Sequence, residues 1–519
     1  MGFGLIHFEL RSPTQLIRSL THSSTHSSTH SPTHSPTMTH PSPPLTPKLP
    51  LSAKLAFGAG DMGAGLTANL VVFSFLIFLT NVAGLSPGLA STVLLIGKVW
   101  DALTDPMVGF LSDRTQSRWG RRHSWMLFGS IPFGISFALM WVVPPVASPT
   151  LKFLYYVIVS LVFFTAYTAI NLPYAALTPE LTQDYDERTS LNSFRLSFSL
   201  GGAVFGLMLG LVISGWISEV RSQYLTIGII GAILATLPLY WCIWGTRPHL
   251  NIPSFTKTAA ETPNPKSPIE NPPIPFSKQL KIAFSNRPFL YVIGIYLLSW
   301  LALQVTASNI PFFVQSWMGL NSYFLVALLV QGCAIPMLFV CDRLCKKMGK
   351  RGLYFLGMGF WIVIQSFLFF LQPGQTGLLY FLALCASFGV ATAYIVPWSM
   401  LPDVIELDEL ETGERREGIF YSFMTLLQKI GYAAGIFVVG QALERAGFVA
   451  AVPGEALPIQ PDSALFAIRL VIGPFPTLCL LGGVILAYFY PITRDRHAEI
   501  LLQLQERKRQ LLTDTNDLD

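Results

Sequence analysis

The chain has few charged residues for its length. Of its 519 residues, 12% are Asp, Glu, Lys or Arg and 51% are hydrophobic, whereas a soluble protein carries about 25% charged residues. The deficit extends along most of the chain, which excludes an ordinary soluble globular domain. This composition predicts a polytopic membrane protein whose surroundings are mainly lipid.

Cysteine pairs and zinc-protease motifs are also missing. The six cysteines fall in apolar segments or at their edges and form no CxxC pair, which argues against a disulfide framework or a zinc site. No HExxH motif is present, so the chain lacks the zinc-binding motif of a membrane metalloprotease. We expect no enzymatic activity, no cofactor and no nucleic-acid partner.

Residues 1–50 lack the apolar side chains that a folded domain needs. The segment THSSTHSSTHSPTHSPTMTH repeats with a period of four and consists almost entirely of Thr, His, Ser and Pro, which predicts a disordered tail. The alternative is a metal-binding tract that uses His22, His26, His30 and His34. No apolar h-region with a small-residue cleavage site is present, so we predict no signal peptide.

Apolar runs of spanning length follow one another from Lys54 onward. About 20 helical residues, rising 1.5 Å each, cross the hydrocarbon core. The polar, Pro-rich stretch 247–287 predicts a linker, and the charged, periodic segment 492–519 predicts an amphipathic helix on the membrane surface. We therefore predict an all-α membrane protein with two six-helix bundles, 51–246 and 288–491, and spans near 55–82, 87–112, 124–145, 152–179, 189–216, 223–245, 288–315, 322–342, 352–371, 376–401, 418–444 and 464–490.

Two loops concentrate the basic residues. The loop after the second span carries Arg114, Arg118, Arg121 and Arg122, and the loop after the eighth carries Arg343, Lys346, Lys347, Lys350 and Arg351. The loops AGLSPG and WMGLNS, on the other side, carry neither Lys nor Arg. By the positive-inside rule, the basic loops, the linker and both termini are cytoplasmic. We expect the plasma membrane to be the location.

The same loops belong to an internal repeat. DRTQSRWGRR, from Asp113, and DRLCKKMGKR, from Asp342, share Asp, Arg and Gly at the same offsets, and LPYAALTPEL, from Leu172, is echoed by VPWSMLPDVI, from Val396. Their corresponding places in the two groups of spans indicate a duplicated bundle around a central cavity, which is a carrier architecture. We expect Asp113 and Asp342 to pair with basic residues or to cap helix ends, and not to bind substrate.

The second span carries charge where lipid disfavours it. Lys98, Asp101 and Asp105 are spaced by three and four residues, so they share one helical face, and Thr104 adds a hydroxyl beside them. Two carboxylates and a hydroxyl suit a monovalent cation or a shared proton. The alternative is a structural Lys98–Asp101 or Lys98–Asp105 pair with the other aspartate protonated.

Four further polar groups lie inside predicted spans. Lys429 lies near the middle of the eleventh span and needs a carboxylate partner, for which Asp101 or Asp105 is the natural choice; snorkelling to the interface is the alternative. Arg195 in the fifth span either pairs with Asp101 or positions the substrate. Thr168 and Asn171 precede Pro173, which frees backbone carbonyls, and hydrogen bonding between helices explains them equally well.

The fifth position is Asp61, in the glycine-rich stretch GAGDMGAG of the first span. The glycines allow another helix or a ligand to approach closely. Packing explains Asp61 at least as well as binding does.

Several of these stretches resemble one known family. WDALTDPMVGFLSDRTQSRWGRRHSW, AYTAINLPYAALTPEL, ERTSLNSFR and PWSMLPDVIELDELETGERREGIFYSF resemble the glycoside–pentoside–hexuronide:cation symporters, the melibiose-carrier group of the major facilitator superfamily, over about residues 54–491. The resemblance implies twelve helices in two halves, alternating access, and uptake coupled to sodium, lithium or protons. The resemblance assigns the cation site to Asp101, Asp105, Thr104 and Thr168. It also implies that Lys429 corresponds to the mid-span lysine of the family, and Arg195 to the arginine in its fifth span.

The chain departs from this family where the sugar carriers bind sugar. The aspartate of the first span aligns with Gly65, or is displaced to Asp61, the aspartate of the fourth span is Asn171, and the nearby tryptophan is Ala175. PWSMLPDVI also resembles the sodium-dependent lysophospholipid carriers. We therefore expect a monomeric symporter for a sugar or glycoside, with a lysolipid or another amphiphile as the alternative substrate and a non-transporting receptor or scaffold as the second alternative.

Overall fold

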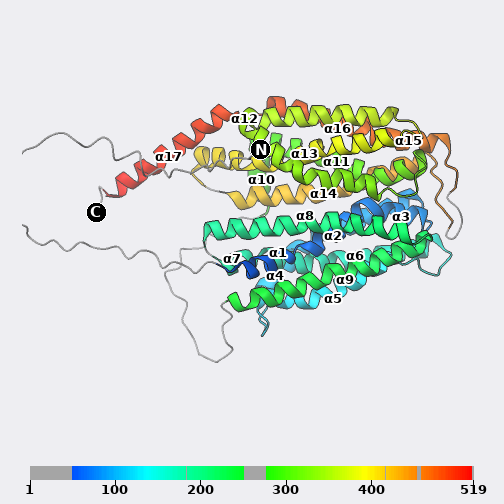
Figure 1. Ribbon diagram of the computed structural model, residues 1–519. Coiled ribbons are helices and arrows are strands. Elements are labelled where there is room, and N and C mark those ends of the chain that lie inside the picture. Colours follow the sequence, from blue (N-terminus) through cyan, green and yellow to red (C-terminus); the bar gives the residue numbers. More distant parts are fainter. Residues whose placement is uncertain (1–48, 183, 251–275, 415, 453–457, 517–519) are drawn as a thin grey trace, which may run out of the picture. The chain divides into compact units, whose positions relative to one another are not determined.

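The computed structural model describes residues 49–182, 184–250, 276–414, 416–452 and 458–516, and these residues are helical with connecting turns and no strand (Figure 1). The predicted tail, with its four histidines, and most of the predicted linker lie outside the described residues. The helices are α1 (Leu51–Ala59), α2 (Met62–Leu70), η2 (Val71–Phe75), α3 (Leu76–Asn81), α4 (Pro87–Arg114), α5 (Arg121–Met140), α6 (Pro149–Ala175), α7 (Thr178–Leu181), α8 (Tyr185–Trp216), α9 (Val220–Thr246), η3 (Arg247–His249), α10 (Phe276–Ser285), α11 (Arg287–Phe312), η4 (Phe313–Trp317), α12 (Phe324–Phe370), α13 (Thr376–Thr412), α14 (Glu417–Arg445), α15 (Asp462–Ile472), α16 (Pro474–Phe489) and α17 (Arg494–Asn516).

Ten helical stretches among the described residues are long and apolar enough to cross a membrane. Each of the twelve predicted spans nevertheless has a helical counterpart. The first reason why ten stretches are found and not twelve is α4, whose 28 residues are long enough to cross a membrane but whose charged side chains lower its hydropathy. The second reason is α12, a 47-residue stretch that contains two predicted spans, which are separated by a break at Gly349, where φ is 75°. Glycine adopts this left-handed conformation without the cost that a Cβ adds.

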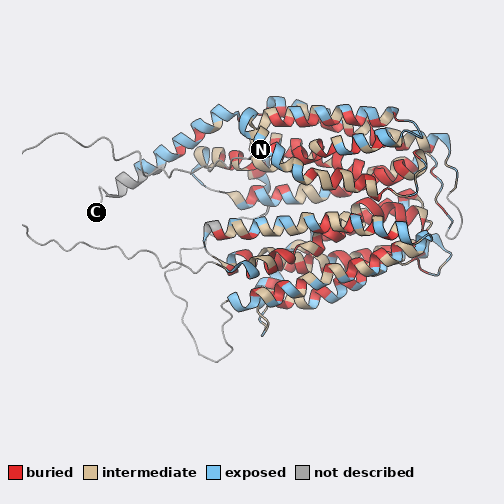
Figure 2. Ribbon diagram, viewed as in Figure 1, coloured by how far each residue is buried: buried red, intermediate tan, exposed pale blue. Residues whose placement is uncertain are grey.

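The helices α1–α9 lie beside α11–α16 (Figure 1), and α4 packs along α14 where the two groups meet. Buried residues follow the helix faces that meet one another, and exposed residues lie on the outer faces (Figure 2). Many outward-facing side chains are large and apolar, among them Phe128, Ile131, Ile233, Phe367 and Phe381. An apolar exterior on long helices is the surface that lipid requires, so the chain is an integral, multi-pass membrane protein.

The two basic loops mark one end of the helix bundle, which we call the basic end. The other end is called the opposite end. Several hydrogen bonds join the two groups of helices there. They join Gly88 N to Glu444 Oε2 (3.0 Å), Ser214 to Ser322 (3.2 Å), Tyr224 to Tyr323 (3.2 Å) and Ala451 N to the Thr80 carbonyl (3.2 Å). The two groups are therefore tied together at the opposite end.

One of the opposite-end loops contains a pattern that hydrolases also use. Gly84–Gly88 reads GLSPG, which has the GxSxG spacing of a nucleophile elbow. Here Ser86 is the N-cap of α4, and its hydroxyl accepts a hydrogen bond from the Leu89 N–H (3.5 Å). Pro87 occupies the first position of the helix, where its missing N–H costs nothing. The motif therefore starts a helix.

The helix α17 forms the amphipathic segment expected after residue 491. Its His497 Nε2 lies 2.6 Å from Glu406 Oε2 and 3.3 Å from Asp403 Oδ1, both on α13. Its Ile500 is buried and its other faces are largely exposed. The His497 contacts, a short apolar stripe and a hydrogen bond from Arg507 Nη1 to the Leu410 carbonyl (3.3 Å) thus attach α17 to α13 at the basic end.

We expect His497→Ala to loosen this attachment, because it removes the contact with both carboxylates. Trypsin should cleave near Arg507 several-fold faster in the variant than in the wild type, measured by limited proteolysis of the detergent-purified protein. His249→Ala, at an exposed position of η3, is the matched control and should leave the rate unchanged. Equal cleavage of both variants would mean that His497 does not hold α17 in place.

Candidate functional site

The charged face of α4 meets two other helices inside the bundle. Lys98, Asp101 and Asp105 project from α4 toward Thr168 on α6 and Lys429 on α14. The face exists because residues three and four apart stack on one side of a helix. The three helices come from both groups, so this cluster joins the two halves of the bundle at mid-height.

The Lys429 ammonium lies between the two aspartates. Its Nζ is 2.5 Å from Asp105 Oδ2 and 3.1 Å from Asp101 Oδ2. Lys98 Nζ approaches Asp101 Oδ2 at 3.3 Å. Two ammonium groups thus balance two carboxylates, which reduces the several kcal/mol that an unpaired charge costs inside a membrane protein.

Two threonines accompany the carboxylates in different ways. The Thr168 hydroxyl lies 2.8 Å from Asp101 Oδ1 and 3.3 Å from Asp105 Oδ1, so it bridges both. The Thr104 hydroxyl donates to the Asp101 backbone carbonyl (3.1 Å), one turn back along α4. Of the two predicted hydroxyls, Thr168 is therefore the one that contacts the carboxylates directly.

Exposure differs strongly across the cluster. The Asp101 side chain is 1% exposed, whereas Asp105 is 32% and Lys429 is 24% exposed. Asp101 is consequently held on all sides by protein. Asp105 and Lys429 are partly exposed, so they form the more accessible side of the cluster.

Aromatic side chains that the sequence analysis did not select surround Lys98. Its Nζ lies 4.3 Å from the ring centroid of Phe164, 4.8 Å from that of Tyr432 and 5.7 Å from that of Tyr167. The negative faces of such rings stabilise an ammonium. A signal for them existed, because Phe164 is four residues before Thr168 and Tyr432 is three after Lys429, and these spacings place side chains on a common helical face.

Arg195 and Asp61 form a separate pair. Arg195 Nε donates to Asp61 Oδ2 at 3.1 Å, and its guanidinium lies 5.3 Å from the Tyr174 ring centroid. The predicted partnership of Arg195 with Asp101 is therefore replaced by one with Asp61, which lies at the break between α1 and α2. Asn171 is half-buried and makes no side-chain hydrogen bond to the described residues.

Gly65 explains one departure from the sugar carriers. A Cβ built on this residue would lie 2.0 Å from the Ser199 carbonyl oxygen on α8, far inside van der Waals contact. The backbones of α2 and α8 touch here, as glycine allows in membrane bundles. No side chain at position 65 can reach a ligand in this packing.

This contact predicts the effect of Gly65→Ala. Alanine normally stabilises a helix relative to glycine by about 1 kcal/mol, but here it forces α2 and α8 apart. We expect a clearly lower melting temperature and yield in detergent, measured by fluorescence-detected size-exclusion chromatography after heating. Gly201→Ala is the matched control, because a Cβ there meets nothing within 4 Å; if both variants melt together, the close approach does not matter.

The predicted loop residues lie at the basic end, away from the cluster. Asp113 pairs with Arg122 (2.5 Å), Arg121 pairs with Glu180 (2.6 Å), Asp342 with Lys346 (2.6 Å) and Lys350 with Asp403 (2.6 Å). Arg351 donates to the Tyr488 carbonyl (2.8 Å), Arg114 lies over Phe110, and Arg118, Arg343 and Lys347 are exposed. The basic loop is thus tied to α7, which follows α6, in the first half and to α13 in the second half.

A family model and several known proteins match most of this chain. The family model described as "MFS/sugar transport protein" matches residues 56–494. An uncharacterised symporter of Synechocystis sp. is 46% identical, over 89% of this chain and 98% of its own length. The sodium-dependent lysophosphatidylcholine symporter 1-A of Danio rerio is 28% identical (87% and 88% covered), and a putative sulfoquinovose importer of Salmonella typhimurium is 26% identical (90% and 95%).

The matched region includes the charged cluster and all the spans except the first five residues of the first span. The relatives are transporters and not enzymes, and the resemblance to cation symporters in the sequence is confirmed. The chain belongs to the MFS/sugar transport protein family of the major facilitator superfamily.

Proposed function

We propose that the protein is a symporter that carries a neutral sugar or glycoside together with a sodium ion by alternating access. The observation that supports it most is the cluster of Asp101, Asp105 and Thr168 around the Lys429 ammonium. Carboxylate and hydroxyl oxygens are the ligands that hard cations prefer. A proton shared by the two aspartates is the alternative coupling ion, and lithium an additional one.

The position of Lys429 supports a displacement mechanism. Its ammonium, 2.5 Å and 3.1 Å from the two aspartates, occupies the place that a sodium ion would take. A sodium ion that enters between Asp101 and Asp105 expels the ammonium, and the ammonium returns when the ion leaves. Because Lys429 is on α14 and the aspartates are on α4, each exchange breaks or forms a link between the two halves.

The contacts at the opposite end indicate that the carrier is closed at that end. With the basic loops on the cytoplasmic side, as proposed for a plasma-membrane protein with cytoplasmic termini, the contacts such as Gly88–Glu444 close the outer end. The cluster then communicates with the cytoplasm through the exposed sides of Asp105 and Lys429. Substrate and ion raise each other's affinity by the same factor, as linkage requires.

Two observations support a sugar as the substrate. The family description names sugar transport, and a half-buried, unbonded Asn171 beside the cluster offers both a donor and an acceptor. The similarity to a lysophosphatidylcholine symporter makes a lysolipid the second candidate. A receptor that uses a carrier fold would bind its ligand without dependence on a cation.

The test is a thermal-shift panel on the purified protein with neutral hexoses, pentoses, their methyl glycosides and lysophosphatidylcholine, each with sodium or with potassium. We expect a neutral sugar to raise the melting temperature in sodium and much less in potassium. Stabilisation that is identical in both salts would rule out coupling. Stabilisation by lysophosphatidylcholine alone would replace the sugar by the lipid.

A further inference from the structure

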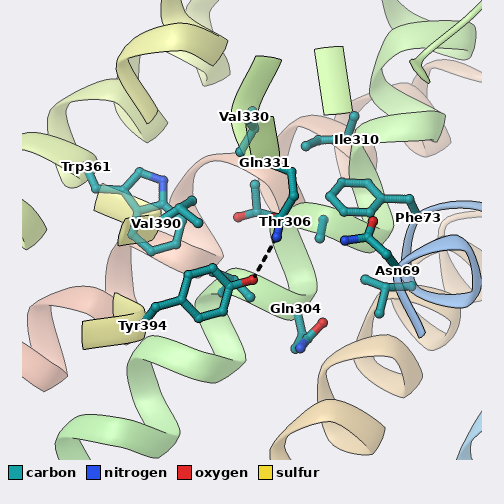
Figure 3. A pocket seen from close by; sticks show the side chains of 13 residues that line it. Asn69, Phe73, Gln304, Thr306, Ile310, Val330, Gln331, Trp361, Val390 and Tyr394 are labelled. Atoms are coloured by element: carbon teal, nitrogen blue, oxygen red, sulfur yellow. Dashed lines mark hydrogen bonds between the residues drawn. The ribbon is translucent and has the colours of Figure 1, made fainter. Parts of the chain in front are cut away.

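A cavity at the basic end is lined by charged groups. It has a volume of about 550 Å³ and extends from the break in α12 to the start of α17. Its lining includes Lys350, Asp403, Arg494 and His497. The cavity where α2 and η2 meet α11, α12 and α13, in contrast, has no charged lining residue (Figure 3). The basic end therefore offers charged side chains to a ligand other than the proposed substrate.

Three side chains with metal-binding atoms meet at the edge of this cavity. His497 Nε2, on α17, lies 2.6 Å from Glu406 Oε2 and 3.3 Å from Asp403 Oδ1, both on α13. One such atom from each residue lies within 4.8 Å of the other two. Two ligand atoms on one tetrahedral zinc ion lie about 3.3–3.6 Å apart, given bonds of about 2.0–2.2 Å. The cluster is therefore close to the size that a single ion requires.

The cluster has more acceptors than donors. A neutral imidazole with its proton on Nε2 donates one hydrogen bond there, yet His497 Nε2 faces two carboxylates. Lys350 Nζ donates to Asp403 Oδ1 (2.6 Å) and to the Ser399 carbonyl (2.6 Å), so it balances one of the two negative charges. One negative charge remains beside a neutral His497, which favours a cation as the ligand.

The ligand types favour a transition metal over sodium, magnesium or calcium. Imidazole nitrogen suits zinc and its neighbours, whereas hard cations prefer oxygen alone. Asp403 is 4% exposed, and the Lys350 ammonium fixes its orientation, as hydrogen bonds to ligating carboxylates do in metal sites. The partly exposed Glu406 can move the fraction of an ångström that the ion requires. The adjoining cavity leaves room for a water molecule as the fourth ligand.

We propose that Asp403, Glu406 and His497 bind a divalent transition-metal ion, such as zinc, which fastens α17 to the end of α13. The ligands come from both helices, so the ion binds when α17 is attached and not when it is detached. By mass action the ion therefore stabilises the attached state. This site lies at the basic end and does not depend on the proposed symport function.

Zinc chloride is the probe for this site. The full-length protein is purified in detergent without a polyhistidine tag and freed of metal by a chelator. Trypsin cleavage near Arg507 should slow about tenfold when zinc is at ten times its dissociation constant, because cleavage requires the detached helix. Magnesium at the same concentration should have no effect, since it prefers oxygen ligands. A wild-type cleavage rate that zinc leaves unchanged would overturn the proposal.

Glu406→Gln separates metal binding from hydrogen bonding. Glutamine keeps an oxygen that accepts a hydrogen bond from His497 but loses the charge of the metal ligand. Cleavage without zinc should therefore stay close to the wild-type rate, and zinc should no longer slow it. Glu411→Gln, at an exposed position of the same helix, is the matched control and should retain full protection. Equal protection of Glu406→Gln and the wild type would contradict the site.

A count of bound ions distinguishes this site from the histidines of the predicted tail. Equilibrium dialysis against zinc measures the total number of ions that each full-length protein holds. The wild type should hold one ion more than Glu406→Gln, whatever the four tail histidines bind. Equal numbers in the two proteins would show that Glu406 is not a ligand and would overturn the proposal.

Discussion

Asp101→Asn is expected to abolish sodium-driven accumulation of substrate in proteoliposomes. The carboxylate is 1% exposed and contacts Lys98, Lys429 and Thr168 at once, so no water can replace it as an ion ligand. Removing one partner of a buried charge cluster destabilises the fold by about 3–5 kcal/mol. Losing one of the two carboxylate ligands should in addition lower the affinity for sodium by roughly a hundredfold, or about 2.7 kcal/mol. Uptake of the neutral sugar with and without an inward sodium gradient measures the effect.

Two further variants separate coupling from folding. Asp113→Asn removes a carboxylate from the same helix that is 59% exposed and bonded only at the basic end, and accumulation should be retained. Asp101→Asn combined with Lys98→Met restores the balance of charge; its melting temperature should recover toward the wild type while accumulation stays absent. Accumulation by Asp101→Asn at the wild-type level would show that the ion binds elsewhere.

Lys429→Gln is expected to bind sodium more tightly and to transport less. Without the ammonium at 2.5 Å and 3.1 Å from the two carboxylates, sodium has no competitor, and its affinity should rise at least about tenfold, or about 1.4 kcal/mol. The maximal uptake rate should fall severely, because no group remains to displace the ion once it has arrived. Calorimetric titration with sodium and initial rates of uptake measure the two effects.

Lys346→Gln is the control for the loss of an ammonium, since Lys346 is 74% exposed and pairs with Asp342 one turn away. Both its sodium affinity and its uptake should match the wild type. Weaker sodium binding in Lys429→Gln would contradict displacement, because it would mean that the lysine supports the ion site and does not compete for it.

The parts of the site that depend on one helix could be predicted from the sequence. Lys98, Asp101 and Asp105 share a face because of their spacing alone. Lys429 could be paired with them because an isolated ammonium in a membrane bundle needs a carboxylate. The distance of 324 residues between Asp105 and Lys429 did not hide this pair, because few other charges are available inside the spans.

Parts that depend on several helices could not be predicted. Arg195 was expected to pair with Asp101 or to position the substrate, and it is the packing of α8 against α2 that pairs it with Asp61. The contact of Gly65 with Ser199 likewise follows from that packing.

Hydropathy predicts the positions of the helices but not the breaks within a span. Apolar runs placed the helices, and the turn expected between the spans 322–342 and 352–371 is present within α12 as the break at Gly349, where φ is 75°. The first span is interrupted at Gly60 and Asp61 and again by the π-helical η2. Breaks of this kind depend on contacts with neighbouring helices, which no hydropathy pattern contains.

The central claim is that Asp101 and Asp105 bind the ion whose place Lys429 holds. The most direct test is a calorimetric sodium titration of the wild type and of Asp101→Asn/Lys98→Met, both in lipid nanodiscs without sugar. We predict saturable binding of one sodium ion per wild-type molecule and no binding by the double variant. An isotherm of the double variant that matches the wild type would contradict the account.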